Sequence, residues 1–245
     1  MTDASESGAA DVRILFQDGD IVAVSKPPGM LVHRGMGADR SEEFLLQRVR
    51  DMCGSRVHAA HRLDRPTCGV VLFAKSPEMA RALQESWKSG AVRKTYMGIC
   101  RGWMPDSDGL RDESLDDPDT GKLQEARTNW REEGRVELPF PLGGHDTSRF
   151  GLLRLEPHTG RWHQIRRHLS RMAHPLVGDT VHGDRRTNHL LQDKLGWWRL
   201  MLWARSLELP HPRSGVPLEI HDEGGGIIPF WEELVRLGTT LEVAA

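Results

Sequence analysis

The stretch HAAHRLDRPTCGV occupies residues 58–70 and leads directly into the apolar run VLFA at 71–74. The apolar run fits a buried strand, and Pro66 excludes a regular helix through the residues before it. Asp64 is therefore expected in a turn at the start of a buried strand, with Arg62 and Arg65 beside it. Such guanidinium neighbours favour a carboxylate over a carboxylic acid, which suits a nucleophile or an electrostatic stabiliser. The same residues also fit an inert cluster of surface ion pairs.

A second charged segment, HTGRWHQIRRH, spans residues 158–168. Five arginines between Arg154 and Arg171 face a single acid, Glu156, which gives a net charge of +4 in eighteen residues. Apolar side chains recur at helical spacing over 161–172, at Trp162, Ile165, Leu169 and Met172. The opposite side of this helix would carry Arg166, Arg167, His168 and Arg171. The pattern predicts a positive face able to contact phosphates, although a merely solvated helix face fits it as well.

Composition restricts the class of protein. The 245 residues contain 33 Lys and Arg against 35 Asp and Glu, so bulk charge cannot be what binds an anionic partner. A local basic groove remains compatible with the formal net charge of −2. The hydrophobic and charged fractions are typical of a soluble globular protein, and no apolar run approaches the ~20 residues of a membrane span. Three cysteines without a CxxC pair, and an N-terminus without a signal peptide, indicate a reducing, cytoplasmic compartment.

The order of predicted elements indicates an α+β fold, because strands and helices mix without regular βαβ alternation. We expect a hairpin of strands 14–16 and 21–24, and further strands over 69–74, 95–100, 150–155 and 200–209. Helices are expected over 41–52 with Ser41 as N-cap, from Pro77 to before Gly90, and over 161–172 and 229–238. Residues 1–11 read as a disordered tail and 12–240 as one domain, with 105–121 as an acidic, solvated surface insertion.

Motifs for cofactors and metals are missing from the sequence. It contains no GxxxxGK[ST], GxGxxG or GxSxG pattern, so neither a nucleotide cofactor nor a serine hydrolase is indicated. Two sets of residues have a loose resemblance to metal ligands: His58, His61 and Asp64, and His163, His168 and His174. Neither set has the spacing of a known metal motif, so we expect no metal and no cofactor and keep a metallohydrolase only as an alternative.

Four motifs in a fixed order resemble the RluA family of RNA pseudouridine synthases. HRLDRPTCGV at 61–70, followed by FAK at 73–75, is similar to the family signature. KPPG at 26–29, KTY at 94–96 and TGRWHQIR at 159–166 resemble the N-terminal, tyrosine and C-terminal motifs of the family. HPLVGD at 174–179, with HGD at 182–184 and Asn188, is most similar to the TruC-like tRNA branch. The resemblance covers roughly residues 12–237. The sequence departs from the family pattern at three places: Cys68, which stands where the family has Ser; Trp162; and the acidic insertion.

The resemblance implies an enzyme that detaches uracil from N1 in RNA and rejoins it through C5, without a cofactor. It implies a mixed, mainly antiparallel sheet flanked by helices, with a central active-site cleft and no preceding S4-type domain. Asp64 would be the essential aspartate, Arg166 its partner, and Tyr96 the ring that stacks on the base, with Ile165 packed beneath it. The other expected substrate contacts are Arg62, Arg65, Arg161, His163 and Arg167.

The expected substrate is a T-stem uridine of tRNA, with ribosomal RNA as the alternative within the same family. A non-catalytic RNA-binding module is the alternative from another class. RNA is the expected partner, and we expect neither a membrane nor a nucleotide cofactor to be one. We expect the chain to be a monomer, because the sequence has no heptad pattern.

Overall fold

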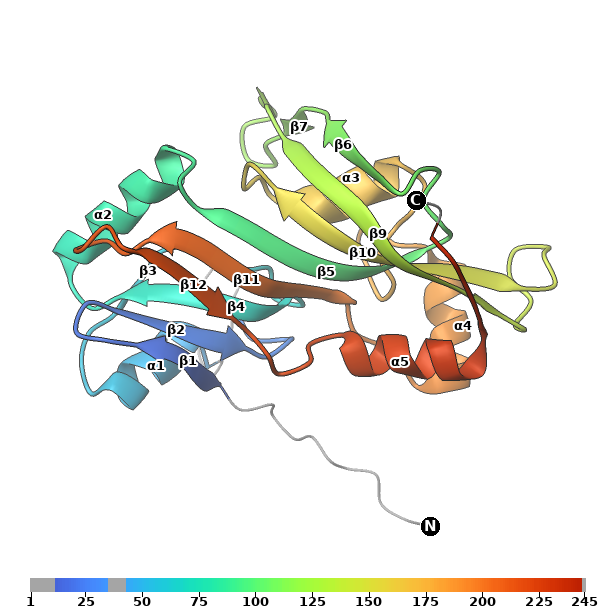
Figure 1. Cartoon of the computed structure of the whole chain (residues 1–245), viewed down its shortest axis with the longest axis horizontal. Helices are drawn as coiled ribbons and strands as arrows, with labels where there is room; N and C mark the ends of the chain where they lie inside the picture. Colours follow the sequence, from blue (N-terminus) through green and yellow to red (C-terminus); the bar gives the residue numbers. More distant parts are fainter. Residues whose placement is uncertain (1–11, 35–42, 244–245) are drawn as a thin grey trace, which may run out of the picture.

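A single eleven-stranded sheet organises the computed structural model, which describes residues 12–34 and 43–243 (Figure 1). In order across the sheet its main path is β1 (Arg13–Gln17), β2 (Ile21–Lys26), β4 (Cys68–Ala74), β11 (Leu202–Pro210), β5 (Arg93–Arg101), β10 (Ser148–Pro157), β9 (Arg127–Leu138) and β13 (Thr239–Leu241). Three strands pair off this path: β3 (His58–Ala59) with β4, β6 (Asp108–Asp112) with β9, and β12 (Pro217–His221) with β11. The short strands β7 (Leu115–Asp116) and β8 (Leu123–Gln124) form a separate hairpin.

The sheet is mainly antiparallel, and its one parallel pairing among the described strands joins β4 to β11. There Gly69 lies opposite Ala204 with φ of 114°, in the left-handed half of backbone space that favours glycine. A Cβ at Gly69 would lie 2.1 Å from the carbonyl oxygen of Ala204. Glycine therefore lets the two central strands meet, and it places the turn that precedes β4 next to the middle of the sheet.

Helices cover both faces of the sheet (Figure 1). On β2, Val22 and Val24 pack with α1 (Leu45–Cys53), whereas the alternate residues Ile21 and Ala23 pack with α2 (Pro77–Lys88). This alternation is the two-residue period of a strand buried on both sides.

The other half of the sheet repeats this arrangement around β10. Its residues Leu153 and Leu155 pack with α3 (Gln164–Arg171). Phe150 and Leu152 point to the other face, against α4 (Arg185–Leu195) and α5 (Ile228–Leu237). The two faces of the large sheet therefore have separate apolar cores, and α3 is fixed over one of them.

The predicted α+β class is confirmed, together with most of the predicted elements. The hairpin β1–β2 forms around residues 18–20, and the Ser76 hydroxyl caps α2 by accepting from the Met79 N–H at 3.2 Å. The first helix begins only at Leu45, after Phe44. The predicted cap Ser41 and the predicted tail at 1–11 lie outside the described residues. Strands β9 and β12 and helix α4 were not predicted.

Two predictions about charged segments are wrong. The insertion at 105–121 is mostly exposed, but it is not an irregular loop, because it contains β6, which pairs with β9, and the buried Leu115. The predicted exposed basic face of the 161–172 helix is buried at Arg166, Arg167 and His168. The insertion folds over α3, and its acids Asp116 and Glu113 pair with Arg167 and Arg171 of that helix. Arg166 pairs instead with Asp64 and Asp179. Trp162, expected in the apolar stripe, precedes the helix and is 41% exposed.

Candidate active site

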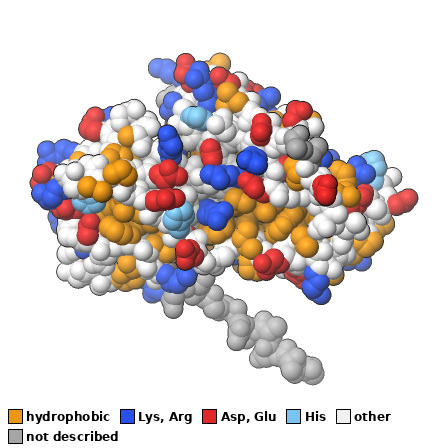
Figure 2. All heavy atoms as spheres, viewed as in Figure 1, with side chains coloured by type: hydrophobic (Ala, Val, Ile, Leu, Met, Phe, Trp, Pro, Cys, Tyr) orange, Lys and Arg blue, Asp and Glu red, His pale blue; other side chains and the backbone are white. Residues whose placement is uncertain are grey.

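A cavity of about 790 Å³ brings together three of the four motif segments. Its walls come from residues 60–67, from the end of α2 with the start of β5, and from residues 157–166. Asp64, Tyr96 and Arg166 all line it. The volume falls within the roughly 300–1,000 Å³ typical of small-molecule sites. On the face shown in Figure 2, basic and acidic side chains are interspersed, in keeping with the near-neutral net charge.

The predicted contact between Asp64 and Arg166 is confirmed, because Arg166 Nη1 donates to Asp64 Oδ2 at 3.2 Å. The rest of the guanidinium is held by Asp179, through Nε to Oδ2 at 2.7 Å and Nη2 to Oδ1 at 2.8 Å. Arg166 is 3% exposed, whereas the Asp64 side chain is 23% exposed and open to the cavity. The planar fork of arginine suits this task, since it binds one carboxylate in bidentate fashion and keeps a donor for another.

The buried Asp179 holds the guanidinium of Arg166 in place. Burial opposes its ionisation, but hydrogen bonds from Arg166 and from the backbone N–H groups of His182 and Val181 hold its pKa below the usual value. Asp179 therefore stays charged and keeps the guanidinium fixed. Sequence reasoning quoted this residue only as part of a motif and gave it no role.

His163 lies at the junction between the cavity and α3. Its backbone is left-handed, with φ of 51°, and its ring stacks on Trp162 at a centroid distance of 3.8 Å. Nδ1 lies 2.9 Å from His182 Nε2, and Nε2 lies 3.7 Å from Asp64 Oδ2. Burial lowers the pKa of His163 to about 4, so the ring is neutral at pH 7. A left-handed non-glycine residue held by two aromatic neighbours is a strained position of the kind that collects at functional sites.

Tyr96 reaches the cavity from β5. It packs in the same apolar cluster as Ile165, as predicted. Burial, with the nearby Asp64 carboxylate, raises the pKa of the Tyr96 phenol well above its usual value. Tyr96 therefore presents a neutral ring and a protonated hydroxyl beside the carboxylate.

The KPPG loop clamps the turn that carries Asp64. Lys26 is fully buried, and its Nζ donates to the carbonyls of Pro27, Met30 and Arg65 at 3.0, 2.7 and 3.0 Å. The Gly29 N–H also donates to the Arg65 carbonyl, at 2.8 Å. Burial lowers the pKa of Lys26 to about 7. These bonds fix the backbone next to Asp64 from a segment almost forty residues away in the sequence.

Two further groups at the cavity escaped the sequence analysis. Lys94 Nζ donates to the Thr159 carbonyl at 2.8 Å and ties β5 to the loop before α3. The Thr67 hydroxyl is buried and lines the cavity, and it has no hydrogen-bond partner in residues 12–34 and 43–243. It lies one turn from Asp64, whose carbonyl accepts from the Thr67 N–H at 3.1 Å. An unpaired hydroxyl at this position is available to a bound molecule.

The predicted substrate-contact residues occupy different places. Arg62 and Arg161 are exposed at the cavity, which His163 and Ile165 also line. Arg65 instead extends to the Gly29 carbonyl, with its Nε at 3.0 Å. Arg167 is 7% exposed and is bound by the carboxylate and carbonyl of Asp116. The expected phosphate contact of Arg167 is therefore not supported, because the insertion already pairs with its guanidinium.

The two histidine sets considered as metal ligands do not converge. His61 accepts from the Leu72 N–H at 3.0 Å and stacks on Trp87, while His168 contacts Thr128 and the Glu113 carbonyl. Over the part of the chain that the structure describes, no three His, Cys, Asp or Glu side chains are grouped to hold a metal ion. The metallohydrolase alternative gains no support from this geometry. No described helix has the length and apolar character needed to span a bilayer.

Residues 20–171, which carry Asp64, Tyr96 and Arg166, match a family model described as RNA pseudouridylate synthase. The chain belongs to this family. It is 44% identical over 238 residues to the tRNA pseudouridine synthase C of Salmonella typhimurium, covering 93% of this chain and 90% of that relative. It is 43% identical to the enzyme of the same name from Pectobacterium carotovorum subsp. carotovorum over 85% of this chain, but it spans only 58% of that relative.

Solved structures agree with this family assignment. The human RNA Pseudouridylate Synthase Domain Containing 4 superposes with a TM-score of 0.70 at 26% identity, covering 95% of each chain. The human RNA Pseudouridylate Synthase Domain Containing 1, with a TM-score of 0.72 and 20% identity over 96% of this chain and 91% of that one, shares the fold. The predicted pseudouridine synthase fold, with a mainly antiparallel sheet and flanking helices, is therefore confirmed.

Proposed function

We propose that this protein converts a uridine of tRNA into pseudouridine, with Asp64 as the essential catalytic residue. The observation that carries the proposal is the position of the Asp64 carboxylate. It is open to a nucleoside-sized cavity and is held by a buried arginine that is itself fixed by Asp179. Membership of the RNA pseudouridylate synthase family supports the reaction, and the relatives named tRNA pseudouridine synthase C support the substrate class.

The reaction rearranges one glycosidic bond and needs no net oxidation. The N1–C1′ bond breaks, the freed base turns, and C5 bonds to C1′; C5 then loses its proton and N1 gains one. Asp64 acts on this exchange as nucleophile toward the ribose or the base, or as the group that removes a sugar proton. Arg166 keeps the carboxylate oriented in each of these routes. A uridine in a stem must leave the base stack to reach Asp64, which costs a few kcal/mol.

Tyr96 and Ile165 form the apolar part of the cavity. We assign the neutral Tyr96 ring to stacking on the extruded uracil, and its hydroxyl to proton transfer at C5. Arg62, Lys88 and Arg161 are exposed cations at the cavity, and we assign the two arginines to the flanking phosphates. All the residues that we assign to the reaction come from one chain, and we propose an enzyme that acts as a monomer without a cofactor.

The experiment is pseudouridine mapping on RNA treated with the purified protein. We expect product in a tRNA transcript, at a uridine of the T stem, and tritium release from C5-labelled uridine in the same transcript. Product confined to ribosomal RNA would overturn the assignment to tRNA while leaving the reaction in place. Tight RNA binding without tritium release from either RNA would identify a non-catalytic binding module instead.

A further inference from the structure

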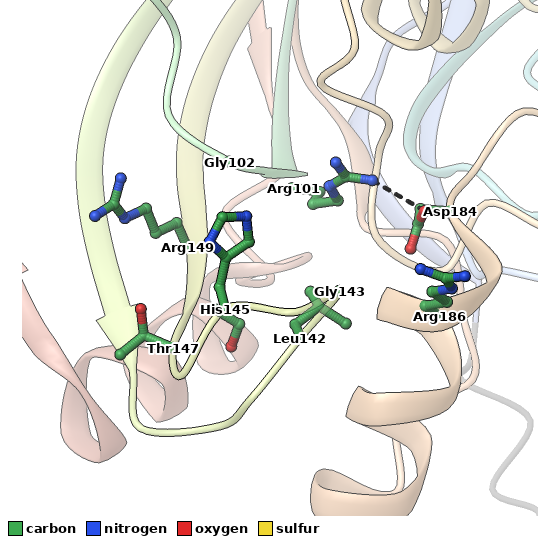
Figure 3. A pocket seen from close by; sticks show the side chains of 10 residues that line it. Arg101, Gly102, Leu142, Gly143, His145, Thr147, Arg149, Asp184 and Arg186 are labelled. Atoms are coloured by element: carbon green, nitrogen blue, oxygen red, sulfur yellow. Dashed lines mark hydrogen bonds and ion pairs between the residues drawn. The ribbon is translucent and has the colours of Figure 1, made fainter.

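A second pocket, of about 350 Å³, lies outside the cavity around Asp64. It is enclosed by the end of β5, the connection between β9 and β10, and the start of α4 (Figure 3). We call it the Ser148 pocket, after the most deeply buried polar residue among those that line it. Of the motifs identified in the sequence, only HGD at 182–184 contributes to its lining, through Asp184.

The charge of the Ser148 pocket is positive. Three arginines line it, Arg101, Arg149 and Arg186, against one acid, Asp184. The Asp184 carboxylate is already engaged, since Oδ1 accepts from the Thr187 N–H at 2.7 Å to cap α4 and Oδ2 accepts from Arg101 at 2.9 Å. In the view of Figure 3, the Arg101 and Arg186 guanidinium groups lie above and below Asp184.

The arginines differ in how firmly they are held. Arg149 donates to Glu137 at 3.0 Å and lies over the Trp103 ring, 4.2 Å from its centroid, which fixes it at the rim. Arg186 is exposed and makes no hydrogen bond or ion pair within the described residues. His145 stands between Arg149 and Arg101 in Figure 3 and adds ring nitrogens to the lining. Arg149 and Arg101 are therefore both bound to carboxylates of the protein, whereas the Arg186 side chain is open to a ligand.

Ser148 supplies an independent sign of a ligand. The residue is 2% exposed, and its Oγ is buried with no hydrogen-bond partner in the described part of the chain. Buried polar groups are nearly always paired, so an unpaired hydroxyl that lines a pocket calls for a partner that the chain does not supply. A hydroxyl donor beside arginines is the combination that recognises phosphate.

The Ser148 pocket and the catalytic cavity have no lining residue in common, but one segment of the chain supports both. One short segment, Asp179–Asp184, carries the Asp179 that holds Arg166, the His182 that contacts His163, and the Asp184 that holds Arg101. The Cα atoms of His182 and Asp184, two residues apart, are at most about 7 Å from each other. The segments that support the two sites are therefore neighbours in the fold, and the proposal that one RNA contacts both sites rests on this proximity.

We infer that the Ser148 pocket binds a backbone phosphate of the same RNA whose uridine is modified. Arg186 and Arg101 supply the charge, and the Ser148 hydroxyl donates a hydrogen bond to a phosphate oxygen. This inference rests on the proposed function, because it takes RNA as the substrate. A free phosphate or a mononucleotide offers the same chemistry, and the experiment separates these sources from RNA.

The test compares Arg186→Gln with Arg185→Gln, a matched control that removes the same charge from the neighbouring, exposed position of α4, outside the pocket lining. Pseudouridine formation is measured on a tRNA transcript that the unaltered protein modifies. We expect Arg186→Gln to raise KM severalfold at unchanged kcat, and to lower the slope of log Kd against log salt by about one. Equal effects of the two substitutions, or no effect of either, would overturn the inference.

Ser148→Ala separates binding from folding. Removing an unpaired buried hydroxyl should leave the melting temperature unchanged or raise it, while KM for tRNA increases. An unchanged KM with an unchanged melting temperature would contradict the role of this hydroxyl. If inorganic phosphate raises the melting temperature of the protein and Arg186→Gln leaves KM for tRNA unchanged, the site takes free phosphate and the inference is wrong. If the proposed function itself is wrong, the unaltered protein forms no pseudouridine in any RNA tested.

Discussion

Asp179 binds Arg166 through two hydrogen bonds of 2.7 and 2.8 Å, and the same guanidinium reaches Asp64 at 3.2 Å. The first pair is buried, and the second opens into the cavity. The orientation of the Asp64 carboxylate thus depends on a buried acid that does not line the cavity. Asp179 is a positioning residue by this geometry.

Asp179→Asn should lower kcat by about 10²-fold, because a misplaced guanidinium no longer orients Asp64. The melting temperature should fall as well, since the change leaves Arg166 with one buried anionic partner fewer. KM for tRNA should change little, and this split between kcat and KM separates positioning from a loss of binding. The exposed Asp193→Asn on α4 is the control. A variant with normal kcat would show that Arg166 does not need this anchor.

The Thr67 hydroxyl offers a prediction for the cavity itself. Thr67→Val replaces an unpaired buried hydroxyl with a methyl group of similar size, so the free energy of unfolding should stay the same or rise. Activity should nevertheless fall roughly tenfold if the hydroxyl bonds the substrate, the effect of a hydrogen bond worth about 1.4 kcal/mol. Thr67→Ser should restore it. Full activity in Thr67→Val would remove this residue from the site.

Stability should decline in mild acid, and His61 is one of the partly buried histidines that cause this, together with His163. Burial lowers the pKa of the folded His61 from 6.5 to about 4, so the unfolded chain binds more protons than the folded chain between these values. The free energy of unfolding should therefore decrease as the pH is lowered from about 6.5 toward 4. Urea unfolding at pH 7 and pH 5 measures this loss. His61→Gln should reduce the difference between the two pH values, whereas the exposed His189→Gln should preserve it.

The parallel contact at the centre of the sheet makes Gly69 sensitive to substitution. Gly69→Ala places a Cβ 2.1 Å from the Ala204 carbonyl oxygen and forces a side chain into the left-handed region. We expect the melting temperature to fall by roughly 6–12 °C, the equivalent of about 3 kcal/mol in a chain of this size. Gly121→Ala is the control, since it has positive φ but open space around it, and the loss should be smaller. Equal losses would mean that backbone strain, not the strand contact, sets the requirement.

The sequence predicted those parts of the fold whose signals lie within a few neighbouring residues. The hairpin β1–β2 follows from a turn between apolar runs, and α2 from a serine cap followed by proline. The site could be assembled because four motifs resemble one family in the same order. What failed depended on distant partners: Arg167 is buried only because Asp116, fifty-one residues earlier in the chain, folds over it. Composition shows the charges of both segments but not their pairing.

Strands such as β9 were missed for a related reason. Its sequence RTNWREEGRVEL carries many charges, and its apolar residues are too few to indicate a buried strand. The strand forms because its three neighbours, β6, β10 and β13, pair with it. The unpaired hydroxyls of Thr67 and Ser148 have no sequence signal at all, since only the packed structure shows that no partner reaches them.

The central claim is that the Asp64 carboxylate performs the isomerisation. The most direct measurement is tritium release from C5-labelled uridine in tRNA by Asp64→Asn, which preserves size and removes the charge. The expected result is no release above background, with the variant binding the same tRNA about as tightly as the unaltered protein. Tritium release by Asp64→Asn at a rate comparable with that of the unaltered protein would contradict the account.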